Sequence, residues 1–327
     1  MRFPVLVAFL QGGLYTKPSE QASKNYLDHL ESPMWIADNW KDYEVLDTSD
    51  GEKLERWKDY YLLRPDPQVI WTSDKKNTHW KNFNGHYHRS NKGGGEWEFR
   101  NLPDEWTVTY KNGAVFHLKP FAFKHTGLFP EQAVNWDWFS SIISKERSSH
   151  PDRPFKVLNL FAYTGGATIA AALAGAEVTH VDASKGMVAW AKENAISSGL
   201  KDAKIRWLVD DCKKFVEREI RRGNKYDGII MDPPSYGRGP GGEVWKIEES
   251  IYPFIKLCEQ LLSDDAKFLL INSYTTGLQP AVLTYMIKTA IVPFHKGVVK
   301  SDEIGLPVSG TDLILPCGAS GRWIKDQ

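Results

Sequence analysis

The chain has 327 residues, of which 42% are hydrophobic and 25% are charged. Such proportions are typical of folded globular proteins, so collagen-like repeats, disulfide scaffolds and wholly disordered chains are excluded, and the length suggests about two domains. Lysine plus arginine and aspartate plus glutamate number 41 each, so the net charge favours no class of partner.

The spacing of the cysteines and the first residues of the chain indicate in which cellular compartment the protein is expected. Cys212, Cys258 and Cys317 are odd in number and widely spaced, which fits neither a disulfide framework nor a CxxC metal pair. The opening MRFPVLVAFLQGG is short and apolar but lacks a convincing cleavage site, and no run approaches the length of a membrane span. We therefore expect a cytoplasmic protein with reduced thiols and an apolar first segment.

Tryptophans and turn signals dominate the first part of the chain. Nine of the thirteen tryptophans lie before residue 150. Short β-rich runs predict strands at residues 43–46, 60–63, 69–71, 96–100, 106–110 and 115–118. Asn112-Gly113 between the last two runs predicts a hairpin. We expect an N-terminal β-rich module over residues 1–122.

From Pro130 the hydrophobic period changes from two to 3.6, which predicts a helix. Strands at 156–161, 177–181, 205–209, 228–231 and 267–272 then alternate with helices at 167–174, 185–197, 213–222 and 245–262. Residues 297–300 and 312–315 complete a terminal hairpin. Regular alternation predicts a doubly wound, mostly parallel seven-stranded α/β sheet, which we assign to residues 123–327.

Two glycines follow the first strand of this second region. Gly165 and Gly166 stand directly before a helix, where they permit unusual backbone angles and the close approach of another group. The first strand-to-helix loop of such sheets borders the ligand crevice. A simple tight turn explains the glycines equally well.

Acidic residues end the next two strands. Asp182 follows the second strand, where a carboxylate can accept hydrogen bonds from both hydroxyls of a ribose. Asp210 and Asp211 follow the third strand, where a carboxylate can reach an adenine amino group. Each acid also suits the N-cap of the following helix, and Ser184 can supply the cap near Asp182 itself.

The fourth strand ends in Asp232-Pro233-Pro234. The prolines lack N–H donors and have fixed φ, so the loop presents carbonyl groups and the Asp232 side chain as rigid acceptors. Such a surface suits an amine or ring nitrogen positioned for attack, and a flat base can rest beside Pro234 or Tyr236. A sharp strand exit alone is the weaker interpretation, because the motif coincides with the glycines and acids of the first three strands.

With these motifs the sequence resembles the class I S-adenosylmethionine-dependent methyltransferases, and within them the group of large-subunit ribosomal RNA cytosine-C5 and guanine-N7 methyltransferases. The resemblance covers residues 120–315. It rests on LNLFAYTGG (158–166), VDASK (181–185), WAKEN (190–194), Asp210-Asp211 and DPPSYG (232–237), with FKHTGLFPEQ (123–132) upstream.

The resemblance implies S-adenosylmethionine as cofactor and assigns roles to particular residues. It implies that the methionine end is lined by Phe161, Tyr163, Thr164, Gly165 and Gly166. It places Asp182 on the ribose with Ala183 and Ser184 beside it, and Asp210 and Asp211 around the adenine. It implies that the transferring methyl group is bordered by Asp232, Pro233 and Pro234, with Tyr236 as a stacking candidate.

Two departures from that group affect the chemistry. Cytosine-C5 enzymes need a cysteine nucleophile after the fourth or fifth strand, where this chain has no thiol, so covalent C5 chemistry is disfavoured and Cys212 and Cys317 are expected to be bystanders. Enzymes that methylate amino groups usually carry an aromatic residue directly after Asp-Pro-Pro. Here Ser235 intervenes before Tyr236.

Residues 75–95 contain basic and aromatic side chains and no acid, a combination that suits a phosphate backbone with unstacked bases. A solvated loop is an equal alternative. A metal bound by His79, His86 and His88 is disfavoured because nothing in the segment completes the coordination shell, so no metal site is predicted. The glycine-rich loop 238–245 suits either a mobile cover carrying Trp245 or an ordinary surface loop.

These patterns favour methyl transfer from S-adenosylmethionine to a nucleobase in RNA, ribosomal RNA first of all, without a cysteine nucleophile. A small-molecule or protein acceptor is the alternative. An NAD(P)-dependent oxidoreductase would have similar glycines and a similar ribose acid, but this chain lacks the GxGxxG motif of that class. A non-enzymatic RNA-binding module is the third interpretation, and it predicts RNA affinity without a cofactor.

Overall fold

The computed structural model describes residues 34–90, 94–121, 124–239 and 241–326, and Met34–Gln327 form one compact unit. The apolar first segment, Lys92 of the basic segment and residues 122–123 at the expected domain boundary lie outside the described residues. The division of the chain at that boundary therefore stays a prediction.

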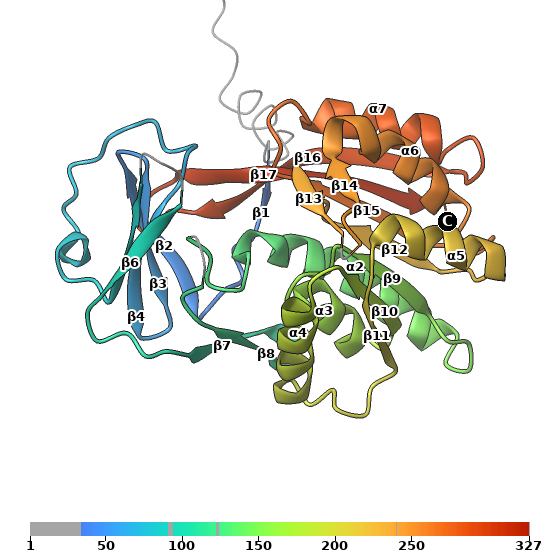
Figure 1. Cartoon of the computed structure of the whole chain (residues 1–327), viewed down its shortest axis with the longest axis horizontal. Coiled ribbons are helices and arrows are strands. Elements are labelled where there is room, and N and C mark those ends of the chain that lie inside the picture. Colours follow the sequence, from blue (N-terminus) through green and yellow to red (C-terminus); the bar gives the residue numbers. More distant parts are fainter. Residues whose placement is uncertain (1–33, 91–93, 122–123, 240, 327) are drawn as a thin grey trace, which may run out of the picture. The chain divides into compact units, whose positions relative to one another are not determined.

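A five-stranded sheet forms the first part of the described chain (Figure 1). Its order is β2 (Tyr43–Ser49), β3 (Glu52–Trp57), β4 (Tyr60–Pro65), β5 (Gly85–Arg89) and β6 (Gly95–Phe99). All neighbours are antiparallel except β4 and β5. A hairpin of β7 (Trp106–Tyr110) and β8 (Ala114–Leu118) follows, turning through Asn112 and Gly113, whose φ values are 59° and 83°. The predicted hairpin is thus confirmed.

Two strands of this sheet are absent from the sequence-based prediction, and one predicted strand is wrong. The sequence does not indicate β3 and β5 because charged or histidine side chains interrupt their alternation. Residues 69–71 form no strand. The N–H of Val69 donates to the Asp66 carbonyl at 3.1 Å and its carbonyl accepts from Gly51 at 2.8 Å, so the segment is a turn after the prolines although Val69 is buried.

The second part contains an eight-stranded sheet. Its order is β1 (Trp35–Ile36), β16 (Gly297–Pro307), β17 (Ile314–Lys325), β15 (Phe268–Ser273), β12 (Gly228–Met231), β9 (Lys156–Leu160), β10 (Glu177–Asp182) and β11 (Ile205–Val209). Every pair is parallel except those that β17 makes with β15 and β16. The doubly wound, mostly parallel fold is confirmed, β1 adds a strand to the seven predicted, and the terminal hairpin is longer than predicted.

Helices cover both faces of the large sheet (Figure 1). They are α2 (Ala133–Ser149), preceded by η3 (Pro130–Gln132), and α3 (Gly166–Leu173), α4 (Lys185–Ser197), α5 (Cys212–Arg222), α6 (Ile247–Glu259) and α7 (Pro280–Ala290). Successive strand residues alternate between two cores, since Ile230 packs with α2 and α3 whereas Ile229 and Met231 pack with α5, α6 and α7. Helix α6 begins two residues later than predicted, and α7 was not predicted.

The two sheets share one hydrophobic core. Trp57 and Leu62 of the five-stranded sheet and Phe116 of β8 belong to the same cluster as Trp136 and Phe139 of α2. All five side chains are buried. Because this core holds both sheets together, side chains from either one can line the same cavity.

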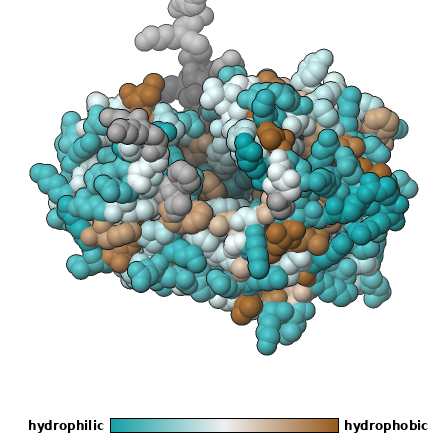
Figure 2. Space-filling view, in the orientation of Figure 1, coloured by the Kyte–Doolittle hydropathy of each residue, from teal (hydrophilic) through white to brown (hydrophobic). Residues whose placement is uncertain are grey.

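The described surface is polar for the most part. The face seen in Figure 2 is largely hydrophilic and is hollowed near its centre. Exposed large hydrophobic side chains include Ile70 in a turn, Phe99 on β6 and Tyr285 on α7. Across the described residues, none of the helices has both the length and the apolar character needed to cross a bilayer.

Candidate active site

The loop between β9 and α3 is held in a strained conformation. Phe161 and Tyr163 have φ values of 56° and 51°, which residues with a Cβ rarely adopt. The N–H of Phe161 donates to the Cys212 sulfur at 3.3 Å, and that of Tyr163 donates to Asp182 Oδ2 at 2.8 Å. Strain of this kind persists only where neighbouring groups fix the backbone, and it is concentrated at functional sites.

The two glycines of this loop are required by neighbouring protein atoms. A Cβ on Gly165, whose φ is 84°, would lie 2.9 Å from the Cβ of Ala191. A Cβ on Gly166 would lie 2.6 Å from the ring of Trp136. The close approach expected from the sequence is therefore present, and the groups approached belong to α4 and α2.

Asp182 fixes the same loop from the end of β10. One carboxylate oxygen accepts from the Tyr163 N–H and the other from the Ser184 N–H, both at 2.8 Å. Burial raises the pKa of Asp182, and these two hydrogen bonds oppose the rise. The N-cap of α4 is Ser184, whose Oγ accepts from the Met187 N–H at 3.4 Å. Asp182 is thus not the cap, and each of its oxygens keeps a second acceptor position.

Both acids that follow β11 interact with α5, one through a hydrogen bond and the other through an ion pair. Asp211 is the N-cap of the helix, and its carboxylate accepts from the Lys214 N–H at 2.9 Å. Asp210 pairs with the guanidinium of Arg218. The capping alternative is therefore correct for Asp211, and the expected contact of either acid with adenine stays a prediction.

Asp232 presents a free carboxyl group beyond the end of β12. It lines a cleft, and no side-chain hydrogen bond to it is found among the described residues. Burial raises its pKa to about 7, and the neighbouring Glu131 carboxyl group adds to the rise. Burial raises the pKa of Glu131 as well. Near neutral pH the Asp232 carboxyl group can therefore either take up or release a proton.

The cleft at Asp232 lies where β9 and β12 end. Its lining comprises Leu128, Phe129, Gln132, Trp136, Asn159, Phe161, Ala162, Tyr163, Thr164, Gly166, Ala167, Ile230, Asp232 and Asn272. The predicted site residues brought together here are Phe161, Tyr163, Thr164, Gly166 and Asp232. Those outside this lining are Gly165, Asp182, Ala183, Ser184, Asp210, Asp211, Pro233, Pro234 and Tyr236.

A buried amide network forms one wall of the cleft, and sequence reasoning missed it. The side chain of Gln132 accepts from Asn135 and from Asn272, each at 2.9 Å, and donates to the Tyr274 hydroxyl at 2.7 Å. Three elements, η3, α2 and β15, are thereby joined. The available signal was Asn272 within the apolar run FLLIN, because a polar side chain inside a buried strand needs partners.

A second cavity of about 320 Å³ adjoins the cleft and shares Leu128 and Phe129 with it. Charged side chains of the five-stranded sheet line it. Arg64 makes two hydrogen bonds to Glu55, at 2.6 and 2.8 Å, and Lys53 pairs with Asp66 at 3.3 Å.

Lys124 is the uncompensated cation of this second cavity. Its Nζ donates to the Pro65 carbonyl at 2.9 Å, and no carboxylate pairs with it among the described residues. Burial lowers the pKa of Lys124 to about 8, and the positive charge of Lys53 contributes to the fall. The cavity therefore offers a positive charge to an anionic ligand.

The three cysteines are free thiols, of which Cys212 accepts from the Phe161 N–H and Cys317 lines the second cavity. Burial raises the pKa of Cys212 and of Cys317 well above the ordinary value. A thiolate is therefore disfavoured at both positions, as expected.

Loop 238–245 does not form an open cover. It connects β13 (Tyr236–Arg238) to β14 (Val244–Lys246) in an antiparallel hairpin. The Trp245 indole N–H donates to the Pro234 carbonyl at 2.8 Å, and its ring packs against Phe161 at a centroid distance of 5.0 Å. Trp245 thus stiffens the Asp-Pro-Pro turn, while Tyr236 is 54% exposed beside it.

The basic segment 75–95 contains no acid itself, but acidic side chains from other parts of the chain lie beside it. Lys75 pairs with Asp50 at 2.9 Å, and Trp80 donates to Asp47 at 2.7 Å. Phe83 and Tyr87 are buried and so cannot stack on a base. Acids from other strands neutralise part of the charge, which weakens the expectation that this surface binds RNA.

The cleft fits S-adenosylmethionine. Within the described part of the chain, the buried hydroxyl of Tyr163 has no hydrogen-bond partner although the side chain lines the cleft, so a donor is available to a ligand carboxylate. Burial raises the pKa of this phenol, which keeps it a donor. Asp182 offers acceptor positions one strand away, in the arrangement by which doubly wound folds hold a ribose.

Comparison with known proteins defines the class. The family model of S-adenosylmethionine-dependent methyltransferases matches residues 69–277, well over half of the chain. The chain belongs to this family, and its cofactor is S-adenosylmethionine. An NAD(P)-dependent oxidoreductase and a non-enzymatic RNA-binding module are thereby set aside.

The chain is also similar to particular proteins. The crystal structure of the SAM-dependent methyltransferase from Agrobacterium tumefaciens is 35% identical, with a TM-score of 0.82 over 90% of this chain and 97% of that one. SMU.776, crystallised with SAH, is 19% identical with a TM-score of 0.65 over 94% and 79%, and shows the fold alone.

Curated relatives are named ribosomal RNA large subunit methyltransferase K/L. The protein from Shewanella frigidimarina is 30% identical over 168 residues, which are 51% of this chain and 22% of that protein. The protein from Pseudoalteromonas atlantica is 36% identical over 146 residues, 44% and 19% respectively. The matched segment thus spans about a fifth of the length of these relatives.

Proposed function

We propose that this methyltransferase acts on a nucleobase nitrogen in RNA, with ribosomal RNA as the substrate to test first. The observation that carries the proposal is the free carboxyl group of Asp232, which lies in the cleft with a pKa raised to about 7 by burial and by Glu131. A general base is most effective when its pKa is close to the working pH. The names of the curated relatives direct attention to ribosomal RNA.

In this proposal the protein supplies positioning and one proton acceptor. S-adenosylmethionine supplies a methyl group that is already electrophilic, so alignment of the acceptor and exclusion of water account for most of the acceleration. Asp232 orients the N–H of the acceptor and takes its proton. Pro233 and Pro234 keep this carboxyl group in place, and Tyr236, although exposed, provides a ring on which an entering base can stack.

The cofactor is held, in the same proposal, by the residues after the first three strands. Tyr163 donates its unpartnered hydroxyl to the methionine carboxylate, and Thr164, Gly165 and Gly166 supply the backbone around it. Asp182 accepts from the ribose beside Ala183 and Ser184. Asp210 and Asp211 border the adenine while remaining bound to α5.

The acceptor reaches Asp232 through the second cavity. Phe129 borders both cavities, and its ring centroid lies 5.6 Å from those of Tyr163 and Tyr274, so aromatic side chains line the boundary between the two cavities. Lys124 provides a buried positive charge for a phosphate next to that base. The module over residues 1–122 then contributes Lys53 and Arg64 to the acceptor cavity, while residues 123–327 contribute Lys124 and Asp232 and hold the cofactor.

A small-molecule or protein acceptor is the second candidate. One observation favours it: acids from neighbouring strands neutralise part of segment 75–95, which weakens this segment as a track for a long polyanion. The second cavity is large enough to enclose a small acceptor.

A cytoplasmic location accompanies the RNA proposal. The three cysteines are free thiols, as is usual in a reducing compartment.

The test is transfer of a labelled methyl group to acceptor pools. Ribosomal RNA transcribed without modifications, denatured cell protein and a metabolite extract are each incubated with enzyme and labelled S-adenosylmethionine. Under the proposal the label appears in RNA, is released by nuclease and is lost with Asp232→Asn although that variant still binds the cofactor. Label confined to protein or to small molecules would overturn the RNA assignment.

A further inference from the structure

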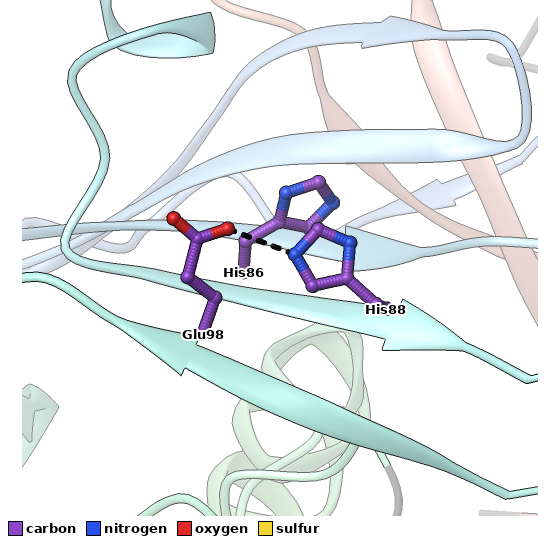
Figure 3. Close-up of side chains that lie close together, drawn as sticks. All are labelled: His86, His88 and Glu98. Carbon is purple, nitrogen blue, oxygen red and sulfur yellow. Dashed lines mark hydrogen bonds and ion pairs between the residues drawn. The ribbon is translucent and has the colours of Figure 1, made fainter.

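Three side chains from two neighbouring strands converge on the outer part of the five-stranded sheet (Figure 3). His86 and His88 are two residues apart on β5 and so project from the same face of the strand. Glu98 on β6 pairs directly with His86 across the strands. One potential ligand atom from each of the three lies within 4.8 Å of the others.

The spacing of these groups is close to that of a tetrahedral metal site. Zinc binds imidazole nitrogen at about 2.0–2.1 Å and carboxylate oxygen at about 2.0–2.2 Å, so two tetrahedral ligands stand about 3.3 Å apart. The His88 Nε2 to Glu98 Oε2 distance is 2.9 Å, and the two imidazole rings have centroids 3.9 Å apart. Small side-chain rotations would therefore suffice to admit an ion.

Neighbouring groups orient two of the three ligands. His86 Nε2 lies 2.6 Å from Glu52 Oε1, which leaves Nδ1 of this ring as the nitrogen available to a metal. Metal-binding histidines commonly donate their other N–H to a carboxylate in this way. Arg100 pairs with Oε1 of Glu98 at 2.6 Å, while Oε2 of Glu98 faces His88 Nε2 at 2.9 Å.

We propose that His86, His88 and Glu98 bind a divalent transition-metal ion, with zinc as the best match. Imidazole and carboxylate ligands suit zinc, whereas calcium and magnesium prefer all-oxygen sites. None of the three residues lines the cleft or the second cavity, so the ion would link β5 to β6 and take no part in methyl transfer.

From the sequence, His79 is considered together with His86 and His88, whereas the structure groups the latter two with Glu98. His79 does not join the cluster, since its ring stacks on Tyr61 at 3.4 Å and its Nδ1 lies 3.0 Å from the Asn82 carbonyl. Glu98 lies outside the acid-free segment and is brought to His86 only by strand pairing.

The test is a calorimetric titration of the full-length protein with zinc chloride, in the absence of cofactor. The wild type is expected to bind one equivalent of Zn²⁺, and His86→Ala, His88→Ala and Glu98→Gln are expected to abolish that binding. Glu52→Gln, which removes only the partner of His86, is expected to weaken it by about 10- to 100-fold. His150→Ala is the matched control, because His150 is another exposed histidine with a carboxylate nearby, Glu146 at 3.6 Å.

Folding of each variant is checked by its affinity for S-adenosylmethionine, which the cluster does not contact. Co²⁺ added to the wild type is expected to give the visible absorption of a four-coordinate site. The proposal fails if the wild type binds Zn²⁺ no more tightly than His88→Ala does, if His150→Ala weakens binding equally, or if Co²⁺ remains octahedral. In that event the cluster is only two histidine–carboxylate hydrogen bonds, His86 with Glu52 and His88 with Glu98.

Discussion

The carboxylate of Asp182 accepts a hydrogen bond of 2.8 Å from the backbone N–H of Tyr163, nineteen residues earlier in the chain. Tyr163 has a φ of 51°, so this bond helps to hold a backbone conformation that is unfavourable by itself. The residue expected to hold the ribose therefore also shapes the loop that surrounds the rest of the cofactor.

Asp182→Ala is accordingly expected to weaken binding of S-adenosylmethionine by at least about tenfold, because hydrogen bonds to a charged group contribute about 1.5–3 kcal/mol each. Calorimetric titration of the folded variant measures the change. Asp202→Ala, which removes an exposed acid between α4 and β11, is the control and should bind as the wild type does. Equal affinities for wild type and Asp182→Ala would mean that the ribose is held elsewhere.

Glu55→Gln tests the buried ion pair of the five-stranded sheet. Glu55 is fully buried, accepts two hydrogen bonds from Arg64 and one of 2.7 Å from the Tyr43 hydroxyl. Removing one partner of such a pair leaves an unpaired buried charge, which typically destabilises a protein by about 3–5 kcal/mol. Urea unfolding measures the difference. Glu44→Gln, which disturbs a half-exposed pair with Arg56, should lower stability by only about 1 kcal/mol or less.

The same residue predicts a pH dependence of stability. Burial by itself would raise the pKa of Glu55, but Arg64 and Lys53 hold it well below its ordinary value in the folded state. The group therefore contributes stability above the unfolded pKa of about 4.3, and this contribution is lost as the pH falls from there through the folded-state pKa. Urea midpoints measured downward from pH 5 should fall less steeply for Glu55→Gln than for the wild type. Parallel curves would contradict the assignment.

The large sheet could be predicted from the sequence because its signals are local. Strand ends at Val209 and Met231 and the whole of α4 follow from apolar periodicity together with turn residues, and Ser184 marks the beginning of α4 as an N-cap. Strand β3 was missed because Glu55 is paired with Arg64 of β4, so its charge misleads a local pattern. Strand β5 was missed because its histidines interrupt the apolar alternation.

The residues of the candidate site could likewise be predicted only where their signals are local in the sequence. Motifs next to strand ends identified Tyr163, Asp182 and Asp232, since parallel strands bring their carboxyl ends to one edge of the sheet. Lys124 and Gln132 were not singled out, because their roles depend on partners far away in the sequence, such as the Pro65 carbonyl and the Tyr274 hydroxyl.

The pH dependence of methyl transfer tests the role of Asp232. Its carboxyl group must be ionised to accept a proton, so kcat should fall about tenfold per pH unit below the pKa of about 7. Glu131→Gln removes a neighbouring negative charge and should move this limb to lower pH, although burial still keeps the pKa of Asp232 above its ordinary value. Single-turnover rates between pH 5 and pH 9 provide the measurement. A rate that is independent of pH across neutrality would exclude Asp232 as the base.

Gly166→Ala tests whether the packing of α3 on α2 sets the geometry of the cleft. The added Cβ would lie 2.6 Å from the Trp136 ring, which itself lines the cleft, so either the ring or the strained loop must move. Such overpacking typically destabilises the folded protein by about 1–3 kcal/mol.

Gly186→Ala is the matched control in the first turn of α4. The nearest atom to the new Cβ is Ser184 Oγ at 3.9 Å, so this variant should stabilise the protein by about 0.5–1 kcal/mol as an ordinary helical substitution. We expect the thermal unfolding midpoint to be lower than that of the wild type for Gly166→Ala and higher for Gly186→Ala. The affinity for S-adenosylmethionine should fall for Gly166→Ala alone. If both variants bind the cofactor as the wild type does, Trp136 can yield without disturbing the loop, and the requirement for glycine at position 166 is one of helix packing only.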